Sequence, residues 1–271
     1  MTATVDECVE TAREYLPVEV VEQWVEQWKG LLRRGYRLRP LGPGEETAVV
    51  CRLGGNPRMP EDQPWPQWPG HGPLTFIAAL DCAALPPGET DLVLPDAGTL
   101  LFFFFDGQLD DGDEVVTAAE ESSQPGARLI YVSQGVPVVE RTAPVVEGVN
   151  QIRPRTEQAL TADQVITAPA YDASGGYPDD ASFFTDLALD LGGPGPHHLL
   201  GGWALPIQDA VELEVARYDH AQAREWLLLA QIDTDERAGM VWGDGGARYW
   251  LIRRQDLIDR RFDRARFTSQ S

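Results

Sequence analysis

Two adjacent histidines stand in the stretch from residue 197 to residue 208, which reads HHLLGGWALPIQ. They are half of the four histidines in the chain. Near neutral pH a histidine can act as an acid, a base or a metal ligand. Acid–base chemistry also needs a carboxylate or a nucleophile within reach, and the aspartate of the later turn WGDGG is the best candidate, because its neighbouring glycines let backbone segments approach closely. The candidate ligand-binding residues are His198, Trp203, Gln208, Trp242 and Asp244.

Both titratable candidates also have a structural interpretation, which we favour. His198 can hold the turn at Gly201 and Gly202 to the neighbouring half of the molecule. Asp244 can accept hydrogen bonds within its own turn. The stretch is then a joint between two halves of the molecule, and a crevice at that joint is where we expect any ligand, because pockets form preferentially between domains. His197 has the weaker claim to a role, and no catalytic residue is assigned.

Motifs of known chemistry are missing from the sequence. It contains no GxxxxGK[ST] phosphate loop, no GxGxxG behind a strand, no GxSxG elbow and no HExxH helix. Cys8, Cys51 and Cys82 are far apart, which predicts reduced, buried thiols. No four residues have the close spacing of a zinc site, and the acidic turn at residues 106–114 lacks the spacing of a calcium loop. We therefore expect neither a metal nor a cofactor.

The chain is strongly acidic, with 43 Asp and Glu residues against 22 Lys and Arg residues and a net charge of −21. Such a charge repels nucleic acids and anionic membranes and attracts basic proteins. We expect no nucleic-acid or membrane partner, and a basic protein is the partner that fits; solubility in a host with an acidic proteome is the alternative reason for the charge. No apolar run is long enough to span a membrane, and the acidic first residues are unlike a secretory signal, so a cytoplasmic protein is expected.

Apolar periodicity predicts helices first and strands afterwards. A T-x-x-E capping box at Thr4 and Glu7 opens one helix, and an apolar face over residues 17–32 predicts a second that ends before Gly35. Short helices are also expected after Asp180 and over residues 254–262. The stretches that predict strands are residues 36–41, 47–53, 74–81, 98–105, 127–134, 137–140, 164–170, 204–216, 225–233 and 247–254.

Large aromatic side chains lie in two contrasting settings. Residues 54–73 are dense in Pro and Gly, which predicts a long ordered loop, and Trp65 and Trp68 within it are expected to fold back as plugs on the body of the protein. Four successive phenylalanines occupy residues 102–105. Because neighbouring residues of a strand point to opposite faces, this strand is expected to be covered on both sides.

One pattern occurs twice in the same order. LTFIAALD at residues 74–81 matches WLLLAQID at 226–233, and PDAGTLLFFFF at 95–105 matches WGDGGARYWLI at 242–252. A strand, a loop, a glycine turn and an aromatic strand are therefore repeated; chance similarity of apolar hairpins is the alternative. The sequence predicts a helical segment at residues 1–35 and an α+β domain at 36–271. This domain is a single globule of two related halves, about 36–150 and 151–271, with mostly antiparallel sheet and the N-terminal helices packed on it.

These stretches resemble the YwqG-like family, a bacterial family of domains of unknown function. The resemblance is carried by GGNPRMP, GPLTFIAALD, LPDAGTLLFFF, HHLLGGWALPIQDAVELE and LLLAQID with MVWGDGGARYWLIRRQDL, and it covers roughly residues 54–261. It implies an α+β fold, a cytoplasmic protein and no assigned reaction, and the nearness of some relatives to secreted-toxin genes hints at immunity or partner binding. The residues that fit the family pattern are His198, Gly201, Pro206, Ile207 and Gln208. Trp203 occupies a position that varies in this pattern.

Three functions follow as expectations. The first is a non-catalytic protein-binding module, immunity-like or regulatory, that takes a basic partner. The alternative is a small-ligand-binding protein or an enzyme that uses a crevice between the halves around His198 and Asp244. The third is a mimic of nucleic acid, with carboxylates spaced like phosphates. Whether the chain is an enzyme is left open.

Overall fold

A ten-stranded antiparallel sheet dominates the computed structural model, which describes residues 28–147, 150–171 and 181–271 together with residues 4, 6, 7, 10, 13 and 14. From one edge to the other the strands are β14 (Arg266–Gln270), β13 (Ala247–Arg253), β12 (Trp226–Asp233), β11 (His198–Gly201), β1 (Arg33–Pro40), β10 (Gln158–Thr167), β2 (Cys51–Leu53), β6 (Thr75–Asp81), β7 (Thr99–Phe104) and β8 (Ala127–Val132). Two small pairs stand apart, β3 (Arg58–Met59) with β9 (Val139–Glu140) and β4 (Gln67–Trp68) with β5 (Gly72–Pro73).

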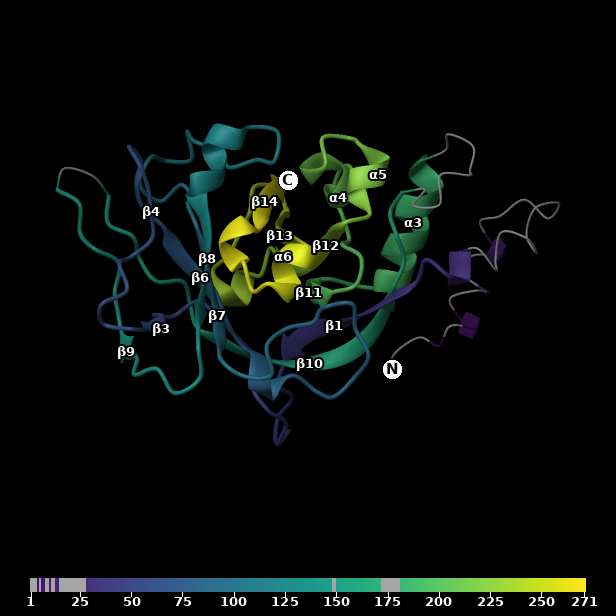
Figure 1. Cartoon of the computed structure of the whole chain (residues 1–271), viewed down its shortest axis with the longest axis horizontal. Coiled ribbons are helices and arrows are strands. Elements are labelled where there is room, and N and C mark those ends of the chain that lie inside the picture. The colour runs from purple at the N-terminus through teal and green to yellow at the C-terminus, as the bar shows by residue number, and fades with distance from the viewer. Residues whose placement is uncertain are drawn as a thin grey trace.

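The helices of the described residues are short. The α-helices are α3 (Ala181–Gly192), α4 (Val211–Val215), α5 (His220–Ala223) and α6 (Arg254–Ile258), and the 3₁₀ turns are η1 (Cys82–Ala84), η2 (Glu121–Gly126), η3 (Glu236–Ala238) and η4 (Phe262–Arg264). Figure 1 shows α3, α4 and α5 gathered beside β11 and β12, away from β6, β7 and β8. Within the part of the chain that the structure describes, no helix has the length and apolar character needed to cross a membrane.

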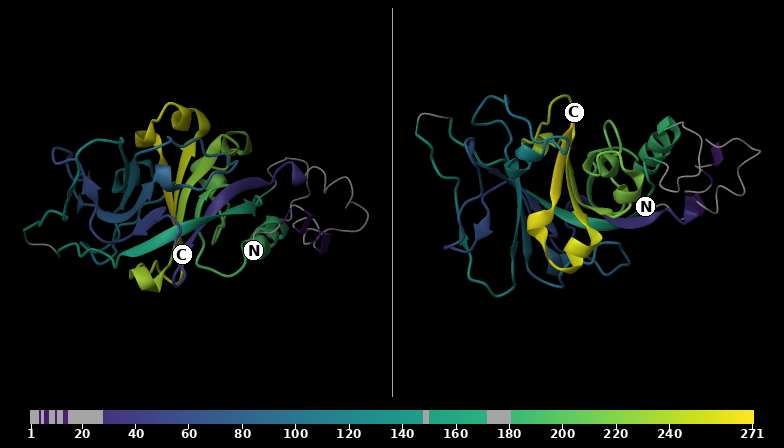
Figure 2. Two further views of the ribbon diagram at one scale, coloured as in Figure 1. Left: turned by 90° about the horizontal axis from the view of Figure 1, so that it is seen from below. Right: turned by 45° about the horizontal axis from the view of Figure 1, so that its top comes forward.

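The sheet curls until its two ends face each other. We call β2, β6, β7 and β8 the first half of the sheet and β11 to β14 the second half; β1 and β10 run beneath both (Figures 1 and 2). Across the interior, the rings of Phe102 and Trp250 lie 5.3 Å apart and those of Phe104 and Phe267 lie 4.7 Å apart. Near the edge strands, Gln124 of η2 bonds both the N–H and the C=O of Phe267. The sheet is therefore almost closed into a barrel around one aromatic core.

The expected α+β class, with helices packed on the sheet, is wrong. The fold is mostly sheet, because the aromatic faces of the two halves bury each other and need no helix to cover them. A second, smaller core lies on the outer side of the second half, where Leu228 and Tyr249 pack with Trp203, Leu205 and Val211. Most of residues 1–27, where the N-terminal helices were expected, lies outside the described residues.

Several expectations about individual segments are confirmed. The capping box forms, because Glu7 N–H donates to Thr4 Oγ1 at 3.2 Å and Thr4 N–H donates to the Glu7 carboxylate at 2.7 Å. Trp65 and Trp68 are buried plugs that meet Phe103 and Phe105 edge-on. The phenylalanine strand is buried on both faces, as expected.

The cysteines that the structure describes behave as expected. Cys51 and Cys82 are free and buried, and burial raises the pKa of each thiol to about 12. Cys8 lies outside the described residues.

Two predictions of elements are wrong. Residues 204–216 do not form a strand, because this stretch runs over the second core and then makes the single turn of α4. In VELEV, apolar residues alternate with Glu, which is the period of two that is typical of a strand. Conversely, His198 to Gly201 form a strand, β11, which pairs with both β1 and β12.

The internal repeat stays a prediction, and three observations support it. The pairing of β6 with β7 is shifted between Phe76 and Ala78, and that of β12 with β13 is shifted at the matching residues Leu228 and Ala230. The strand order reads alike from both edges inward. The glycine pairs that follow β2 and begin at the end of β11 have nearly equal backbone angles, with φ of 64° and 70° at residues 54 and 55 and of 66° and 72° at residues 201 and 202.

Candidate functional site

His198 is fully buried and bonded at both ring nitrogens. Its Nδ1 accepts the backbone N–H of Asp233 at 3.2 Å, and its Nε2 lies 3.2 Å from Asp235 Oδ2. Because Nδ1 accepts a hydrogen bond, the ring proton lies on Nε2 and is donated to Asp235. The pairing of β11 with β12 and the turn that follows β12 place the two side chains together.

Asp235 joins this buried histidine to an arginine at the surface. It caps η3, where its Oδ1 accepts the N–H of Arg237 at 2.9 Å, and its carboxylate also accepts Arg237 Nε at 2.9 Å and Nη2 at 2.6 Å. Burial raises the pKa of Asp235, but the hydrogen bonds from His198 and Arg237 lower it by more, so the net pKa lies well below the ordinary value. Asp235 is therefore a carboxylate at neutral pH.

A neighbouring carboxylate fixes the chain before β11. Asp233 Oδ2 accepts the backbone N–H of His197 at 2.6 Å, and Asp233 Oδ1 accepts Gln231 Nε2 at 2.8 Å. Gln231 in turn bonds Leu205, whose N–H it accepts at 2.9 Å and whose C=O accepts from it at 3.1 Å. The stretch HHLLGGWALPIQ is thus tied on both sides of β11 to β12, a strand of the same half of the sheet. Its role as a joint between the two halves stays a prediction.

The five predicted site residues do not gather in one place. His198 is bonded to Asp233 and Asp235, whereas Asp244 is exposed in its own turn. Trp203 is buried in the second core, with the Arg33 guanidinium 3.5 Å from its ring centre. The remaining two also lie apart: Trp242 belongs to the aromatic core, and Gln208 bonds the C-terminal residues Gln270 and Ser271. Their role in ligand binding stays a prediction, although the contacts of the described residues place these five side chains in different surroundings.

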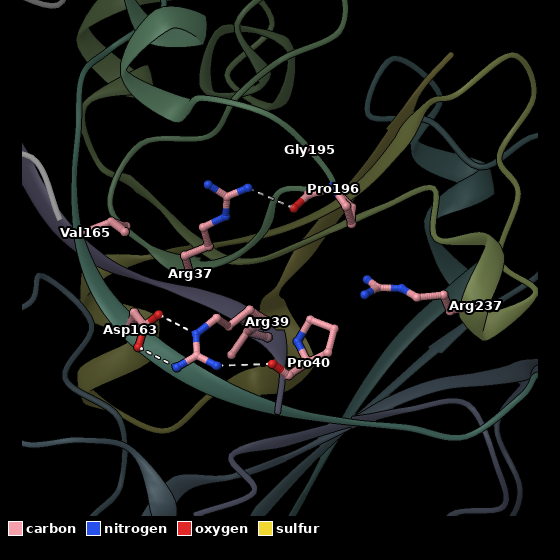
Figure 3. Close-up of a pocket in the computed structure, with 9 residues that line it drawn as sticks. Arg37, Arg39, Pro40, Asp163, Val165, Gly195, Pro196 and Arg237 are labelled. Atoms are coloured by element: carbon pink, nitrogen blue, oxygen red, sulfur yellow. Dashed lines mark hydrogen bonds and ion pairs between the residues drawn. The ribbon is translucent and has the colours of Figure 1, made fainter. Parts of the chain in front are cut away.

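A cavity of about 380 Å³ is lined by Arg237, which bonds Asp235, and by Leu38, which pairs with His198 across β1 and β11. Its wall is made by β1, by β10, by the loop before β11 and by η3 (Figure 3). Three of its lining residues are arginines. The lining is Arg37, Leu38, Arg39, Pro40, Asp163, Val165, Gly195, Pro196 and Arg237.

The three arginines differ in how their charge is balanced. Arg39 pairs with Glu45 at 2.7 Å and with Asp163 at 2.6 Å, and these hydrogen bonds raise its pKa. Arg237 shares Asp235 with His198, as described above. Among the described residues Arg37 pairs with no carboxylate, and its guanidinium donates instead to the carbonyls of residues 192, 194 and 196. Arg37 therefore makes no ion pair among the described residues, although Asp163 stands opposite it on β10.

Figure 3 shows Arg237 extending toward the cavity from the side opposite Arg37. Among the described residues, its Nη1 makes no hydrogen bond to another group, because its bonds to Asp235 use the backbone N–H, Nε and Nη2. The two guanidiniums thus stand on facing walls of one cavity. Such an arrangement suits an oxyanion, which accepts several charge-assisted hydrogen bonds at once.

Sequence reasoning missed the residues that line this cavity. Arg37 and Arg39 are two residues apart in a strand and so share a face, which could have been predicted from their spacing. Asp235 and Arg237 carry no such signal, because the carboxylate is an ordinary N-cap and only the fold brings His198 to it. Within the residues that the structure describes, no three His, Cys, Asp or Glu side chains are grouped so that they could hold a metal ion.

A comparison with protein families finds one match. The model of a family described as a domain of unknown function, DUF1963, matches residues 51–270. The matched range includes His198, Asp235 and Arg237, whereas Arg37 and Arg39 precede it. A search of curated proteins gives no match.

Proposed function

We propose a function for this chain from the premise that it belongs to the DUF1963 family of domains of unknown function: it binds a small molecule that carries a carboxylate or phosphate group, in the cavity between Arg37 and Arg237. The narrower resemblance to the YwqG-like family and a cytoplasmic location belong to this proposal as well. This is the small-ligand alternative of the sequence analysis, moved from Asp244 to the arginine-lined cavity.

The observation that carries the proposal is the set of three arginines on one cavity of an acidic protein. The chain has 22 basic residues against 43 acidic ones, so most of its surface disfavours anions. At this cavity Arg37 has no carboxylate partner among the described residues, and Arg237 has a free Nη1. A ligand oxyanion between the two walls would receive hydrogen bonds from both and would give Arg37 an ion-pair partner.

The buried pair behind Arg237 supports a dedicated site. Arg52 pairs with Ala79 in the first half as Leu199 pairs with Gln231 in the second, so Cys51 stands where the second half has His198. The first half thus builds the corresponding strand with an apolar thiol. Burying a histidine and a carboxylate is costly unless both are bonded, and here they hold Arg237 in one orientation. The strand can therefore form without a polar pair at this position, which favours a role for the pair in positioning Arg237.

The test is calorimetric titration of the whole protein at low salt with two probes, inorganic phosphate and succinate. We expect saturable binding of at least one probe, and which of them binds more tightly assigns the ligand group. Arg37→Gln and Arg237→Gln should each raise Kd at least about tenfold. Arg34→Gln is the matched control, because Arg34 lies on the same strand and is exposed. No saturable binding of either probe, or equal Kd values for all three variants, would contradict the proposal.

A second candidate function is supported by the net charge of −21 alone. It is the protein-binding module of the sequence analysis, immunity-like or regulatory, with a basic protein as partner. Capture from a lysate of the source organism at low ionic strength, followed by release in salt, tests it. A basic protein that then binds the purified chain with a strong salt dependence supports this function, and recovery of no such protein counts against it.

A further inference from the structure

A second cavity lies in the first half of the sheet and shares no lining residue with the cavity between Arg37 and Arg237, which we call the arginine pocket. Its volume is about 640 Å³, and its floor is the outer face of β2, β6 and β7, with Arg52, Ala79 and Leu101. Opposite this floor lie Pro57 and Val138, from the segments that form β3 and β9. We call this space the outer groove.

The corresponding face of the second half is filled by the chain itself. From the matching registers, Gln231 stands where the first half has Ala79, and Tyr249 stands where it has Leu101. Gln231 bonds both the N–H and the C=O of Leu205, and Tyr249 donates its hydroxyl to the same C=O at 3.0 Å. A segment outside any helix or strand, residues 203–206, is thereby seated on this face with all its side chains buried.

The first half has no such segment. After the glycine pair at residues 54 and 55, the chain leaves the face and enters β3. The Trp65 plug covers the part of the face around Phe103, where the two rings lie 5.5 Å apart. The part around Ala79 and Leu101 remains as the outer groove.

Apolar side chains continue beyond the groove along its wall. Val136 and Val139, on either side of Val138, expose 41% and 43% of their surface. Exposed apolar side chains next to a groove with both apolar and charged lining are typical of a protein-binding surface. Five charged residues line the groove, with Asp81, Glu140 and Glu157 against Arg52 and Arg58, so the rim is acidic by one charge.

We propose that the outer groove binds an apolar peptide segment of a partner protein, flanked by a basic residue, in the place that residues 203–206 occupy in the second half. The proposal depends on the correspondence of the two halves and not on the arginine pocket, so either can fail alone. It gives the basic partner of the second candidate function a definite docking place.

The probe for the test is a fluorescent peptide, WALPIQ followed by arginine, which copies residues 203–208. Fluorescence anisotropy with the full-length protein should show saturable binding. Ala79→Trp fills the groove and should raise Kd at least about tenfold. Ala79→Gln supplies the amide that seats Leu205 in the second half, and it should lower Kd. Val241→Trp, at an exposed residue of the other half, should leave Kd unchanged.

Circular dichroism of each variant separates a lost groove from a lost fold, and Ala79→Gln tests the proposal by a gain that misfolding cannot produce. No saturable binding of the peptide overturns the proposal, and so does binding that Ala79→Trp leaves unchanged. Binding of a small apolar dye without binding of the peptide would also overturn it, in favour of a small apolar ligand. Inorganic phosphate and succinate should bind Ala79→Trp as they bind the original chain.

Discussion

His198 has no exposed surface and satisfies two buried groups, the N–H of Asp233 and the carboxylate of Asp235. His198→Ala leaves both without this partner and opens a cavity. We expect the free energy of unfolding to fall by about 2–4 kcal/mol, from the sum of these effects. Urea unfolding of the variant beside Arg34→Ala, an exposed control, measures the difference; a loss no larger than that of the control would mean that the site relaxes around the missing ring.

Asp235 makes stability depend on pH in acid. Its pKa in the folded protein is lower than in the unfolded chain, so its contribution is complete above the unfolded value of about 4 and is lost as the pH falls below it. Asp235→Asn cannot lose a charge there. We therefore expect the original chain to lose stability more steeply than Asp235→Asn from about pH 4 downward. Chemical unfolding at a series of pH values checks this, and parallel profiles would refute it.

For single residues, the sequence predicted which side chains are buried better than which side chains bond each other. Trp65 and Trp68 are plugs because large rings seek burial wherever the loop leads them. The carboxylate beside His198 was predicted to be Asp244, but it is Asp235. The choice depends on a register between strands that the spacing of residues along the chain does not specify.

Among the elements, β1 and β11 approach so closely that no side chain fits between them at Gly35. A Cβ added there would lie 2.6 Å from the carbonyl oxygen of Gly201. Gly35→Ala should therefore push the strands apart and lower the free energy of unfolding by about 1–3 kcal/mol. Thermal unfolding beside Gly195→Ala, where an added Cβ would meet its nearest atoms at an ordinary 3.5 Å, tests this contact. Equal melting temperatures for the two variants would show that β1 can shift.

Strong apolar strands were predictable, and weak alternation was misleading. The whole of β12 is buried, so its continuous apolar run marks a strand covered on both faces. Residues 211–215, VELEV, alternate apolar residues with Glu as an exposed strand would, yet they form α4. Glu212 is buried there and accepts the N–H of Ala204, a tertiary contact that overrides the local pattern.

For the whole molecule, the net charge of −21 implies self-repulsion in the folded state. Salt screens repulsion between surface charges. We expect the melting temperature to rise by a few degrees between about 0.02 M and about 0.5 M NaCl. Scanning calorimetry over this range measures it, with the same series in a neutral osmolyte as a control for exclusion effects. A flat or falling melting temperature would show that local ion pairs outweigh the net charge.

The fold class could not be derived because it depends on what covers the aromatic faces. The sequence marks Phe102 and Trp250 as core residues, but not that they meet each other. Helices were the expected cover, and the opposite half of the sheet fills that role. The repeat, predicted from similar strands that recur in the same order, stays a prediction. Nothing in the sequence indicates that β1 lies between β10 and β11.

The place of β1 between β10 and β11 has a consequence for synthesis on the ribosome. β1 ends at Pro40, but its neighbours β10 and β11 begin only at Gln158 and His198. At roughly 5–20 residues per second, the nascent strand waits on the order of ten seconds for a partner. An unpaired strand invites aggregation, and charged side chains counter it. The four arginines among the eight residues of β1 thus lower the tendency of the newly synthesised strand to aggregate, before any of them lines a pocket.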